Sequence, residues 1–404
     1  MKCGLLGRKL GHSYSPQIHS HLGDYSYDLF EKEPEELEDF LRNSDWSGIN
    51  VTMPYKKDVI PWLDELSPIA QKLGAVNCIV RRDGRLIGHN TDYFGFCEMV
   101  RSSGLDVAGK KVLVLGTGGA SKPVTAALEQ LGANVVSISR SGENNYSNLH
   151  LHADAAVIAN ATPVGMYPNT GVAPVDLSLF PKLEGVLDII FNPAKTQLLL
   201  DAEKRGLVAV NGLLMLVAQA KEASEWFQNA TLDDSLIPVI HTALRRQMEN
   251  IVLIGMPGCG KSTVGKALAE RTGKAFVDAD EEIVRLAGKP IPQIFADDGE
   301  DVFRDWETKA LTELGKKSGQ VLSTGGGCVT KERNYPLLHQ NGTIFWLKRD
   351  LSKLPTDGRP LSQANKLVDM FEIRRPLYAA FADREIDNDG NLEDTLAQIM
   401  EVLT

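Results

Sequence analysis

Residues 112–120 read VLVLGTGGA, and residues 251–262 read IVLIGMPGCGKS. Each stretch is a short apolar run, typical of a buried strand, followed at once by a glycine-rich loop. The first loop has the form of a dinucleotide-binding turn, and the second matches the P-loop pattern with its Lys and Ser. The chain is therefore predicted to bind both a nicotinamide cofactor and a nucleoside triphosphate, which indicates two reactions.

Composition limits the remaining possibilities. A length of 404 residues suggests two or three domains, and an apolar content of 43% is ordinary for a globular chain. The formal net charge of -10 argues against broad binding to nucleic acid or membrane surfaces, so we expect small molecules as partners. The five scattered cysteines lack C-x-x-C spacing, which predicts free thiols in a reducing compartment rather than disulfides or a zinc site. The oligomeric state is not predicted.

Neither a signal peptide nor a membrane span is expected. The opening residues lack the apolar core of a signal peptide, and the most apolar stretch, 207–220, contains Asn211 and is too short to cross a bilayer. We therefore expect a cytoplasmic protein.

Short apolar runs alternate with helix-period segments, which is the pattern of an α/β fold. After the first glycine loop, apolar residues at helical spacing predict a helix over 124–131, followed by a strand over 135–139. After the P-loop, a helix is predicted from 264 to about 273 and a strand over 276–278. A closing helix with a basic end over 236–246 places the domain junction near 247–250.

The first glycine loop needs close approach of backbone amides to a pyrophosphate, so Gly116, Gly118, Gly119 and Ala120 are predicted to contact the cofactor. At the end of the next strand the chain has Ser139-Arg140-Ser141, with no acid for a ribose 2′-hydroxyl. A cation at this place suits a 2′-phosphate, so Arg140 favours NADP over NAD. The alternative is an ordinary solvated Arg at a strand end.

Three further clusters precede that loop: HSYSP at 12–16, NVTMPYK at 50–56 and HNTD at 89–92. Taken alone, the first is more simply a Ser-rich turn at a helix start, and a single Lys is usually a surface Lys. In the third, Asp92 could orient Lys56. The segment GAVN at 74–77 adds the amide of Asn77.

Together these motifs resemble the shikimate dehydrogenase family over about residues 1–246. The match also includes NATPVGM at 160–166 and MLVAQ at 215–219. The resemblance implies that the substrate is 3-dehydroshikimate and that NADPH reduces it to shikimate, with Lys56 and Asp92 as the catalytic pair. It implies that Ser13 and Ser15 hold the substrate carboxylate, and it assigns Thr52, Asn77, Asp92 and Gln219 to the rest of the substrate. Lys56, oriented by Asp92, could protonate the developing alkoxide or stabilise its charge.

The chain departs from that family at three positions. Cys78 replaces the usual Thr after GAVN, Phe191 replaces a Tyr that contacts the substrate carboxylate, and Leu214 replaces a Gly. Loss of the Tyr hydroxyl removes one donor, so we expect substrate binding to weaken by roughly 1 kcal/mol. Leu214 is expected near the nicotinamide.

The second loop predicts nucleotide binding more strongly than the first. Backbone amides of the loop wrap the phosphates, Lys261 neutralises them, and the Ser262 hydroxyl ligates Mg²⁺. The residues assigned to ATP are Gly255, Gly258, Gly260, Lys261, Ser262 and Thr263. The roughly 150 residues that remain suit a small-molecule kinase better than a motor or a GTPase.

Downstream clusters complete a second resemblance. FVDAD at 276–280, GEDVFR at 299–304 with Glu307, GGG at 325–327, RPL at 359–361 and RRPLY at 374–378 occur in this order. Each has a simpler explanation alone, such as a cap, a surface ion pair or a turn, but the ordered set resembles shikimate kinase over about residues 250–404.

The resemblance implies that Asp280 contacts the acceptor hydroxyl, Asp278 lies in the Mg²⁺ shell, and Arg359 in a lid reaches the transferring phosphate. It implies that Arg304 and Arg374 hold the substrate carboxylate above Gly325, Gly326 and Gly327. A guanidinium fork binds a carboxylate bidentately, which suits this role. The lid segment at 353–358 is short for the family and lacks the usual earlier Arg near the adenine.

The sequence therefore predicts an α/β protein with three parts. An α/β substrate lobe (about 1–95, with closing helices at about 220–246) and a Rossmann-type NADP lobe (about 96–219) form a dehydrogenase over 1–247. A P-loop kinase domain with a parallel sheet follows over 248–404. Because shikimate is the expected product of the first part and the expected acceptor of the second, we predict a bifunctional enzyme.

Two alternatives remain open at this stage. One is a quinate- or polyol-type dehydrogenase fused to another small-molecule kinase. The other is a pseudoenzyme that senses these ligands, against which the retained Lys56, Asp92, Lys261, Asp280 and Arg359 argue.

Overall fold

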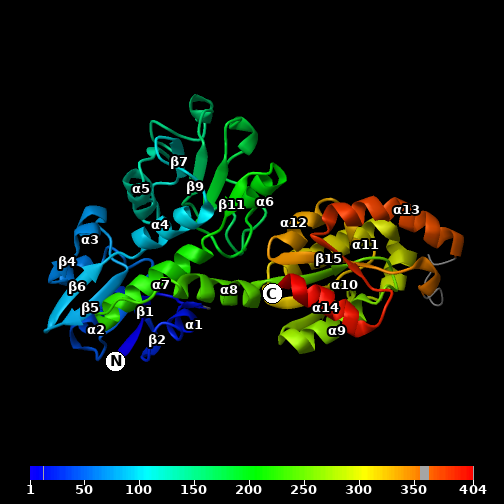
Figure 1. Cartoon of the computed structure of the whole chain (residues 1–404), viewed down its shortest axis with the longest axis horizontal. Helices are drawn as coiled ribbons and strands as arrows, with labels where there is room; N and C mark the ends of the chain where they lie inside the picture. Colours follow the sequence, from blue (N-terminus) through cyan, green and yellow to red (C-terminus); the bar gives the residue numbers. More distant parts are fainter. Residues whose placement is uncertain (12, 355–363, 404) are drawn as a thin grey trace. The chain divides into compact units, whose positions relative to one another are not determined.

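The structure is a computed structural model that describes residues 1–11, 13–354 and 364–403 (Figure 1). The chain divides into two compact units. Unit 1 comprises Met1–Val164, Val172–Phe191 and Leu198–Leu244, and unit 2 comprises Gly165–Gly171, Asn192–Gln197 and Arg245–Thr404.

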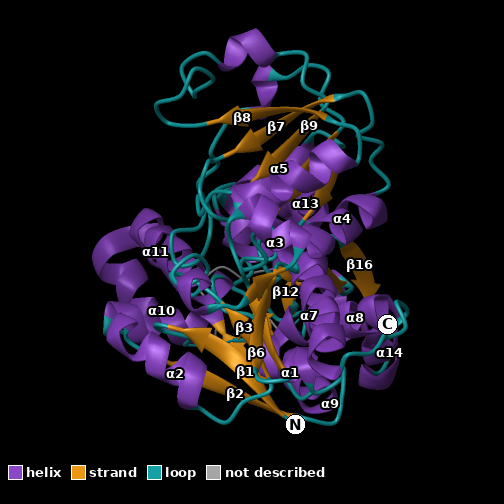
Figure 2. Cartoon of the chain, turned by 90° about the vertical axis from the view of Figure 1, so that its left-hand side faces the viewer, coloured by secondary structure: helices purple, strands orange, loops and turns teal. Residues whose placement is uncertain are grey.

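The first lobe of unit 1 is a six-stranded mixed sheet in the order β2-β1-β3-β5-β6-β4. Strand β1 pairs in parallel with β2 and β3, whereas β5 is antiparallel to both β3 and β6. Its strands are β1 Lys2–Gly7, β2 Ser26–Glu31, β3 Gly48–Val51, β4 Glu65–Leu66, β5 Cys78–Arg82 and β6 Arg85–His89, several of which are labelled in Figure 2. Its helices are α1 Ser15–His19, η1 Pro34–Glu36, α2 Leu37–Asn43, η2 Ile60–Trp62 and α3 Pro68–Leu73.

This lobe has its own apolar core beneath the sheet. Leu6, Ile49, Tyr55 and Ile79 are fully buried there, and the strand β3 is buried along its whole length. Burial on both faces explains why β1 and β3 lack the strict polar–apolar alternation of a half-exposed strand.

The second lobe is a parallel five-stranded sheet in the order β11-β10-β9-β7-β8, the arrangement of a doubly wound fold. The predicted strand–helix–strand around the first glycine loop is confirmed as β7 Lys111–Leu115, α5 Ser121–Gln130 and β8 Asn134–Ile138. The other strands are β9 Val157–Asn160, β10 Gly185–Asp188 and β11 Val208–Val210. Helices of this region are α4 Asp92–Ser103, η3 Leu149–His152, η4 Leu177–Leu179, α6 Gln197–Lys204, α7 Leu213–Gln228 and α8 Leu236–Met248.

Unit 2 contains a parallel five-stranded sheet in the order β13-β14-β12-β15-β16. Its strands are β12 Asn250–Ile254, β13 Ala275–Asp278, β14 Gln320–Ser323, β15 Gly342–Lys348 and β16 Arg384–Asp387. Its helices are α9 Lys261–Thr272, α10 Ala279–Ala287, α11 Ile291–Gly315, η5 Cys328–Thr330, α12 Asn334–His339, η6 Leu351–Lys353, α13 Ala364–Phe381 and α14 Leu392–Leu403. The predicted α/β class with a parallel kinase sheet is confirmed.

Helix α11 is bent at Gly299, whose backbone conformation would strain any other residue. Gly299 has φ 84° and ψ 178° inside it, a conformation that only Gly adopts without cost. The bend separates the segment that carries Phe295 from the segment that carries Arg304 and Glu307.

Polar loops leave both parallel sheets at the carboxyl ends of their strands. Gly116 follows β7, Gly255 follows β12, Asp278 ends β13, and Thr324 follows β14. Ligands of open α/β sheets bind at this edge, which is where both predicted sites should form. Among the described helices, none is long and apolar enough to cross a membrane.

Two candidate active sites

The first site is a cavity of about 320 Å³ in unit 1. It brings together residues from sequence segments far apart, since β1, β3, α4 and α7 all contribute to its wall. All six residues predicted to bind substrate line it: Ser13, Ser15, Thr52, Asn77, Asp92 and Gln219. Lys56 lines it as well.

Lys56 and Asp92 form the central ion pair of this cavity. The Lys56 Nζ lies 2.6 Å from Asp92 Oδ2, and the two side chains are 27% and 15% exposed. Asp92 is the first residue of α4, and the cis Met53-Pro54 bond lies in the turn that leads to Lys56. The pair is partly shielded yet open to the cavity, so Lys56 can reach a ligand there.

A chain of side-chain hydrogen bonds fixes the polar wall. Asn77 Nδ2 donates to Thr91 Oγ1 over 3.0 Å, and Asn77 Oδ1 accepts from the Thr91 backbone amide over 2.7 Å. The Thr91 hydroxyl also lies 3.2 Å from Gln219 Oε1, to which it donates. Thr91 therefore holds in place two residues that are predicted to bind the substrate, Asn77 and Gln219. The sequence analysis assigned no role to Thr91.

The dinucleotide loop lies beside this cavity, since Ala120 lines it. Gly116 has φ 100°, and a β-carbon there would lie 2.9 Å from Thr162 Cγ2. At Gly118 and Gly119, in contrast, an added β-carbon would meet no atom within 4 Å. The loop thus presents bare backbone to open space directly before α5, a suitable cradle for a pyrophosphate.

Arg140 lies just after β8, where the 2′-phosphate of a bound NADP would be recognised. It follows Ser139, whose hydroxyl accepts from the Gly142 amide over 2.7 Å and so closes a tight turn. The Arg140 side chain is exposed. Its charge remains available to a ligand.

The three departures from the dehydrogenase pattern fall in different surroundings. Phe191 lines the cavity, and its ring meets Tyr14 edge-on with centroids 6.2 Å apart. Cys78 is fully buried in β5. Leu214 packs against the core of the second lobe, and the neighbours Met215 and Leu216 line the cavity instead.

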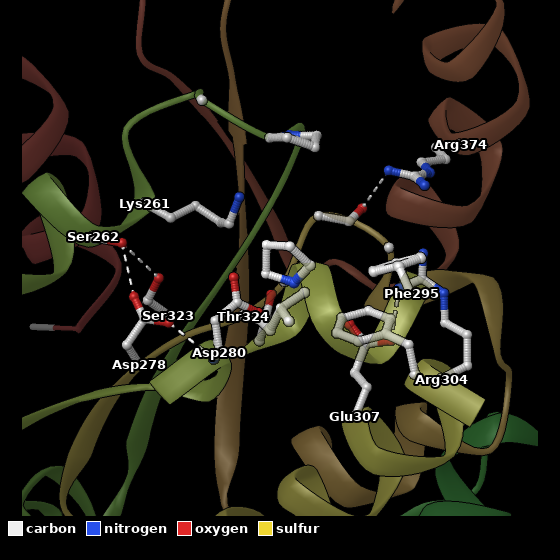
Figure 3. Close-up of a pocket in the computed structure, with 18 of the residues that line it drawn as sticks. Lys261, Ser262, Asp278, Asp280, Phe295, Arg304, Glu307, Ser323, Thr324 and Arg374 are labelled. Carbon is white, nitrogen blue, oxygen red and sulfur yellow. Dashed lines mark hydrogen bonds and ion pairs between the residues drawn. The ribbon is translucent and has the colours of Figure 1, made fainter. Parts of the chain in front are cut away.

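The second site is a cavity of about 800 Å³ in unit 2 (Figure 3). It is lined by most of the predicted kinase residues that the structure describes: Gly258, Gly260, Lys261, Ser262, Thr263, Asp278, Asp280, Arg304, Gly325, Gly326, Gly327 and Arg374. The predicted lid residue Arg359 lies outside the described residues, and Gly255 lies at the base of the loop after β12.

The Lys261 side chain folds back onto the P-loop and bonds its backbone. Its Nζ donates to the carbonyls of Gly255 and Met256 over 3.0 and 3.1 Å. The Ser262 hydroxyl donates to Asp278 Oδ2 over 2.9 Å, and Asp278 Oδ1 accepts from the Asp280 amide over 3.0 Å. A hydroxyl and a carboxylate placed together suit Mg²⁺, which prefers oxygen ligands.

The opposite wall is cationic. Arg304 bonds Glu307 and Glu300, each over 2.9 Å, while Arg374 donates to the Gly326 carbonyl over 3.2 Å (Figure 3). Burial raises the pKa of Glu307 from 4.5 to about 7, although the neighbouring Arg304 favours its ionised form. Glu307 thus orients Arg304 from beneath the cavity.

Each glycine of 325–327 allows a different close approach. A β-carbon would lie 2.7 Å from Glu307 Oε1 at Gly325, 2.6 Å from Pro257 Cδ at Gly326, and 2.2 Å from Arg304 Nη2 at Gly327. Any side chain would displace one of these groups. The triple glycine therefore leaves bare backbone between the acid Asp280 and the two arginines.

Comparisons with known proteins identify the families that the two parts of the chain resemble. A sequence model of the shikimate dehydrogenase substrate-binding domain matches residues 5–79, and one of shikimate kinase matches residues 257–404. A shikimate dehydrogenase (NADP(+)) of Clostridium perfringens is 37% identical over 265 residues, covering 60% of this chain and 97% of that protein. The chain belongs to the shikimate dehydrogenase family.

Solved structures support the same assignment. The shikimate dehydrogenase 1 structure from Peptoclostridium difficile is 37% identical with a TM-score of 0.56, covering 60% of this chain and 97% of that one. A Thermus thermophilus shikimate 5-dehydrogenase in complex with NADP(H) and shikimate is 30% identical with a TM-score of 0.55, covering 60% and 99%. Because a shikimate kinase domain follows the dehydrogenase part, one chain combines an oxidoreductase with a kinase.

Several residues that line the two sites were not predicted. In the dehydrogenase cavity these are apolar residues such as Leu5, Pro123 and Ile189. In the kinase cavity they include Ile291, Phe295, Phe303 and Met370. In the sequence, apolar residues of this kind look like ordinary core positions, so only the folded arrangement reveals them.

Proposed function

We propose that this chain reduces 3-dehydroshikimate to shikimate with NADPH and then phosphorylates the 3-hydroxyl of shikimate with ATP. The observation that carries the proposal is the presence of both sites in one chain. A Lys56–Asp92 pair lies beside a dinucleotide loop, and a P-loop lies opposite Asp280 and two arginines.

In the reductase, the roles follow from the groups that each side chain offers. Ser13 and Ser15 would hold the substrate carboxylate, while Asn77, Asp92 and Gln219 would bind its hydroxyls. NADPH, held by Gly116, Gly118, Gly119, Ala120 and Arg140, supplies the hydride when bound. Lys56 then gives its proton to the oxygen of the former carbonyl, and Asp92 holds the Lys56 side chain in place for this transfer.

In the kinase, Arg304 and Arg374 would hold the carboxylate of shikimate over Gly325, Gly326 and Gly327. Asp280 would accept the hydrogen bond of the acceptor hydroxyl and receive its proton as the oxygen attacks. ATP supplies the phosphoryl group, and Lys261 neutralises charge on the phosphates. Ser262 and Asp278 would hold Mg²⁺, which offsets the negative charge of the phosphates, and Arg359 is assigned to the transferring phosphate.

A coupled assay on the full chain tests the proposal. With 3-dehydroshikimate, NADPH, ATP and Mg²⁺, mass spectrometry should detect shikimate 3-phosphate. Omission of ATP should stop the sequence at shikimate, and chelation of the metal should stop phosphorylation while NADPH oxidation continues. If quinate with NAD were turned over faster than shikimate with NADP, the substrate assignment of the first site would be wrong.

A further inference from the structure

Arg349 is a cation beside the P-loop that no role above includes. It follows β15 directly, and β15 pairs in parallel with β12, the strand that leads into the P-loop. A β-carbon built on Gly260 would lie 3.5 Å from Arg349 Nη1. The guanidinium therefore lies against the backbone of the nucleotide-binding loop.

The Arg349 side chain has no partner of its own within the described ranges. Its Nε is buried and lacks a hydrogen-bond acceptor there. The carboxylates nearby are engaged elsewhere, since Asp350 accepts from Ser352 and Asp389 pairs with Lys353. No described side chain therefore holds this guanidinium, and Arg349 as a whole is only half-buried, so part of the group is open to a ligand.

Arg349 lies on the outer side of the loop rather than among the phosphates. Asn388 Nδ2 lies 3.1 Å from the same position on Gly260 and donates to the Cys259 carbonyl over 2.5 Å. The amides of a P-loop face the phosphates, so its carbonyls face away from them. Arg349 and Asn388 thus share the outer rim, where the nucleoside end of ATP would leave the loop.

Arg349 also lines a second cavity of unit 2, of about 580 Å³. Trp346, Phe371 and Met256 provide apolar wall, and Glu385, Asp387 and Asp389 provide carboxylates. Lys348 also lines the cavity, and its charge is paired with Glu385. Carboxylates repel phosphates but accept hydrogen bonds from ribose hydroxyls and from an exocyclic amine. The lining therefore suits a nucleoside better than a phosphate group.

We propose that Arg349 binds the nucleoside part of ATP, with its planar guanidinium against the base. This inference rests on the proposed kinase function and adds a residue to its ATP site. A guanidinium stacks well on aromatic faces, because it is flat and weakly hydrated.

The test measures ADP binding by calorimetry in the full chain, for the parent protein and for Arg349→Met, which keeps the stem and removes the charge. The affinity for ADP should fall about tenfold, the size of one well-formed cation–π contact. The affinity for inorganic tripolyphosphate should stay within about twofold. Arg384→Met is the matched control, because this exposed arginine donates to the Asp383 carbonyl, lines neither of the two unit 2 cavities described above, and should leave ADP binding unchanged.

Two results would overturn the assignment. Unchanged ADP affinity in Arg349→Met would show that the guanidinium makes no contact with the nucleotide. An equal loss for ADP and tripolyphosphate would place it on the phosphates instead. Failure of the kinase proposal is recognised separately, because the parent chain would then not phosphorylate shikimate at all. In that case ADP binding to the parent still decides the role of Arg349.

Discussion

At the scale of single residues, Lys56 carries the strongest prediction. Lys56→Ala should lower the rate of 3-dehydroshikimate reduction by ~10² to 10⁴, the usual size of a lost general acid. Phosphorylation of shikimate by the same protein should be nearly unchanged. Steady-state rates of both reactions measure this, with Lys57→Ala as the control because Lys57 is exposed and does not line the cavity. More than about half of the parent turnover in Lys56→Ala would remove Lys56 from the mechanism.

Arg140 is predicted to set the choice of dinucleotide. One charge-assisted hydrogen bond contributes about 1.5–3 kcal/mol, or roughly ten- to a hundredfold in specificity. Arg140→Ala should therefore reduce kcat/KM for NADPH by that factor and leave kcat/KM for NADH nearly constant.

Kinetics with both dinucleotides, in parent and variant, decide the role of Arg140. Lys110→Ala is a suitable control, since Lys110 precedes β7 and pairs with Glu184. Equal losses with NADPH and NADH would mean that Arg140 does not recognise the 2′-phosphate.

At the scale of elements, α11 buries an acid that makes stability depend on pH. The pKa of Glu307 rises from 4.5 to about 7 because the carboxyl is buried. Below about pH 4.5 the Glu307 carboxyl is protonated in both the folded and the unfolded chain. The free energy of unfolding is then at its highest with respect to this group. Between pH 4.5 and 7 the unfolded chain releases the proton while the folded chain keeps it, so the free energy of unfolding falls, by on the order of 3 kcal/mol.

Glu307→Gln should therefore flatten this dependence. Calorimetric melting at pH 5 and pH 8 measures it, on the transition that ADP shifts to higher temperature. The difference in melting temperature between the two pH values should be smaller in the variant than in the parent. Glu300→Gln is the control, because Glu300 bonds the same Arg304 but is 57% exposed. An unchanged pH dependence in Glu307→Gln would show that Glu307 does not titrate in this range.

At the scale of the whole molecule, the two sites are built from different sheets. Lys261→Ala should abolish most phosphorylation of shikimate, because phosphoryl transfer depends on positioning and charge stabilisation. NADPH-dependent reduction should continue at the parent rate, since every residue of that cavity belongs to unit 1. Lys266→Ala on the same helix is the control, as Lys266 is exposed and lies over the Phe276 ring. Loss of both activities in a folded Lys261→Ala protein would contradict the model of two independent sites.

The sequence alone determined the fold class and the two nucleotide loops, because both depend on local patterns. The runs 112–115 and 251–254 are apolar, and in the structure both are buried in the inner strands β7 and β12. The glycines that follow allow backbone conformations and close approaches that other residues do not, so their spacing alone indicates phosphate binding. The ordered motifs also predict roles for Lys56, Asp92, Lys261 and Asp280, all of which line the two cavities.

Only the tertiary structure decided which other groups meet at each site. Thr91 links Asn77, in another loop, to Gln219 in α7. Phe295 lies in the kinase cavity ahead of the bend at Gly299, and Arg349, at the end of β15, meets Gly260 in the P-loop. None of these contacts follows from neighbouring residues, because each depends on strand order and on the burial of side chains far apart in the chain. Local sequence patterns specify elements and loops, whereas long-range packing determines which side chains share a cavity.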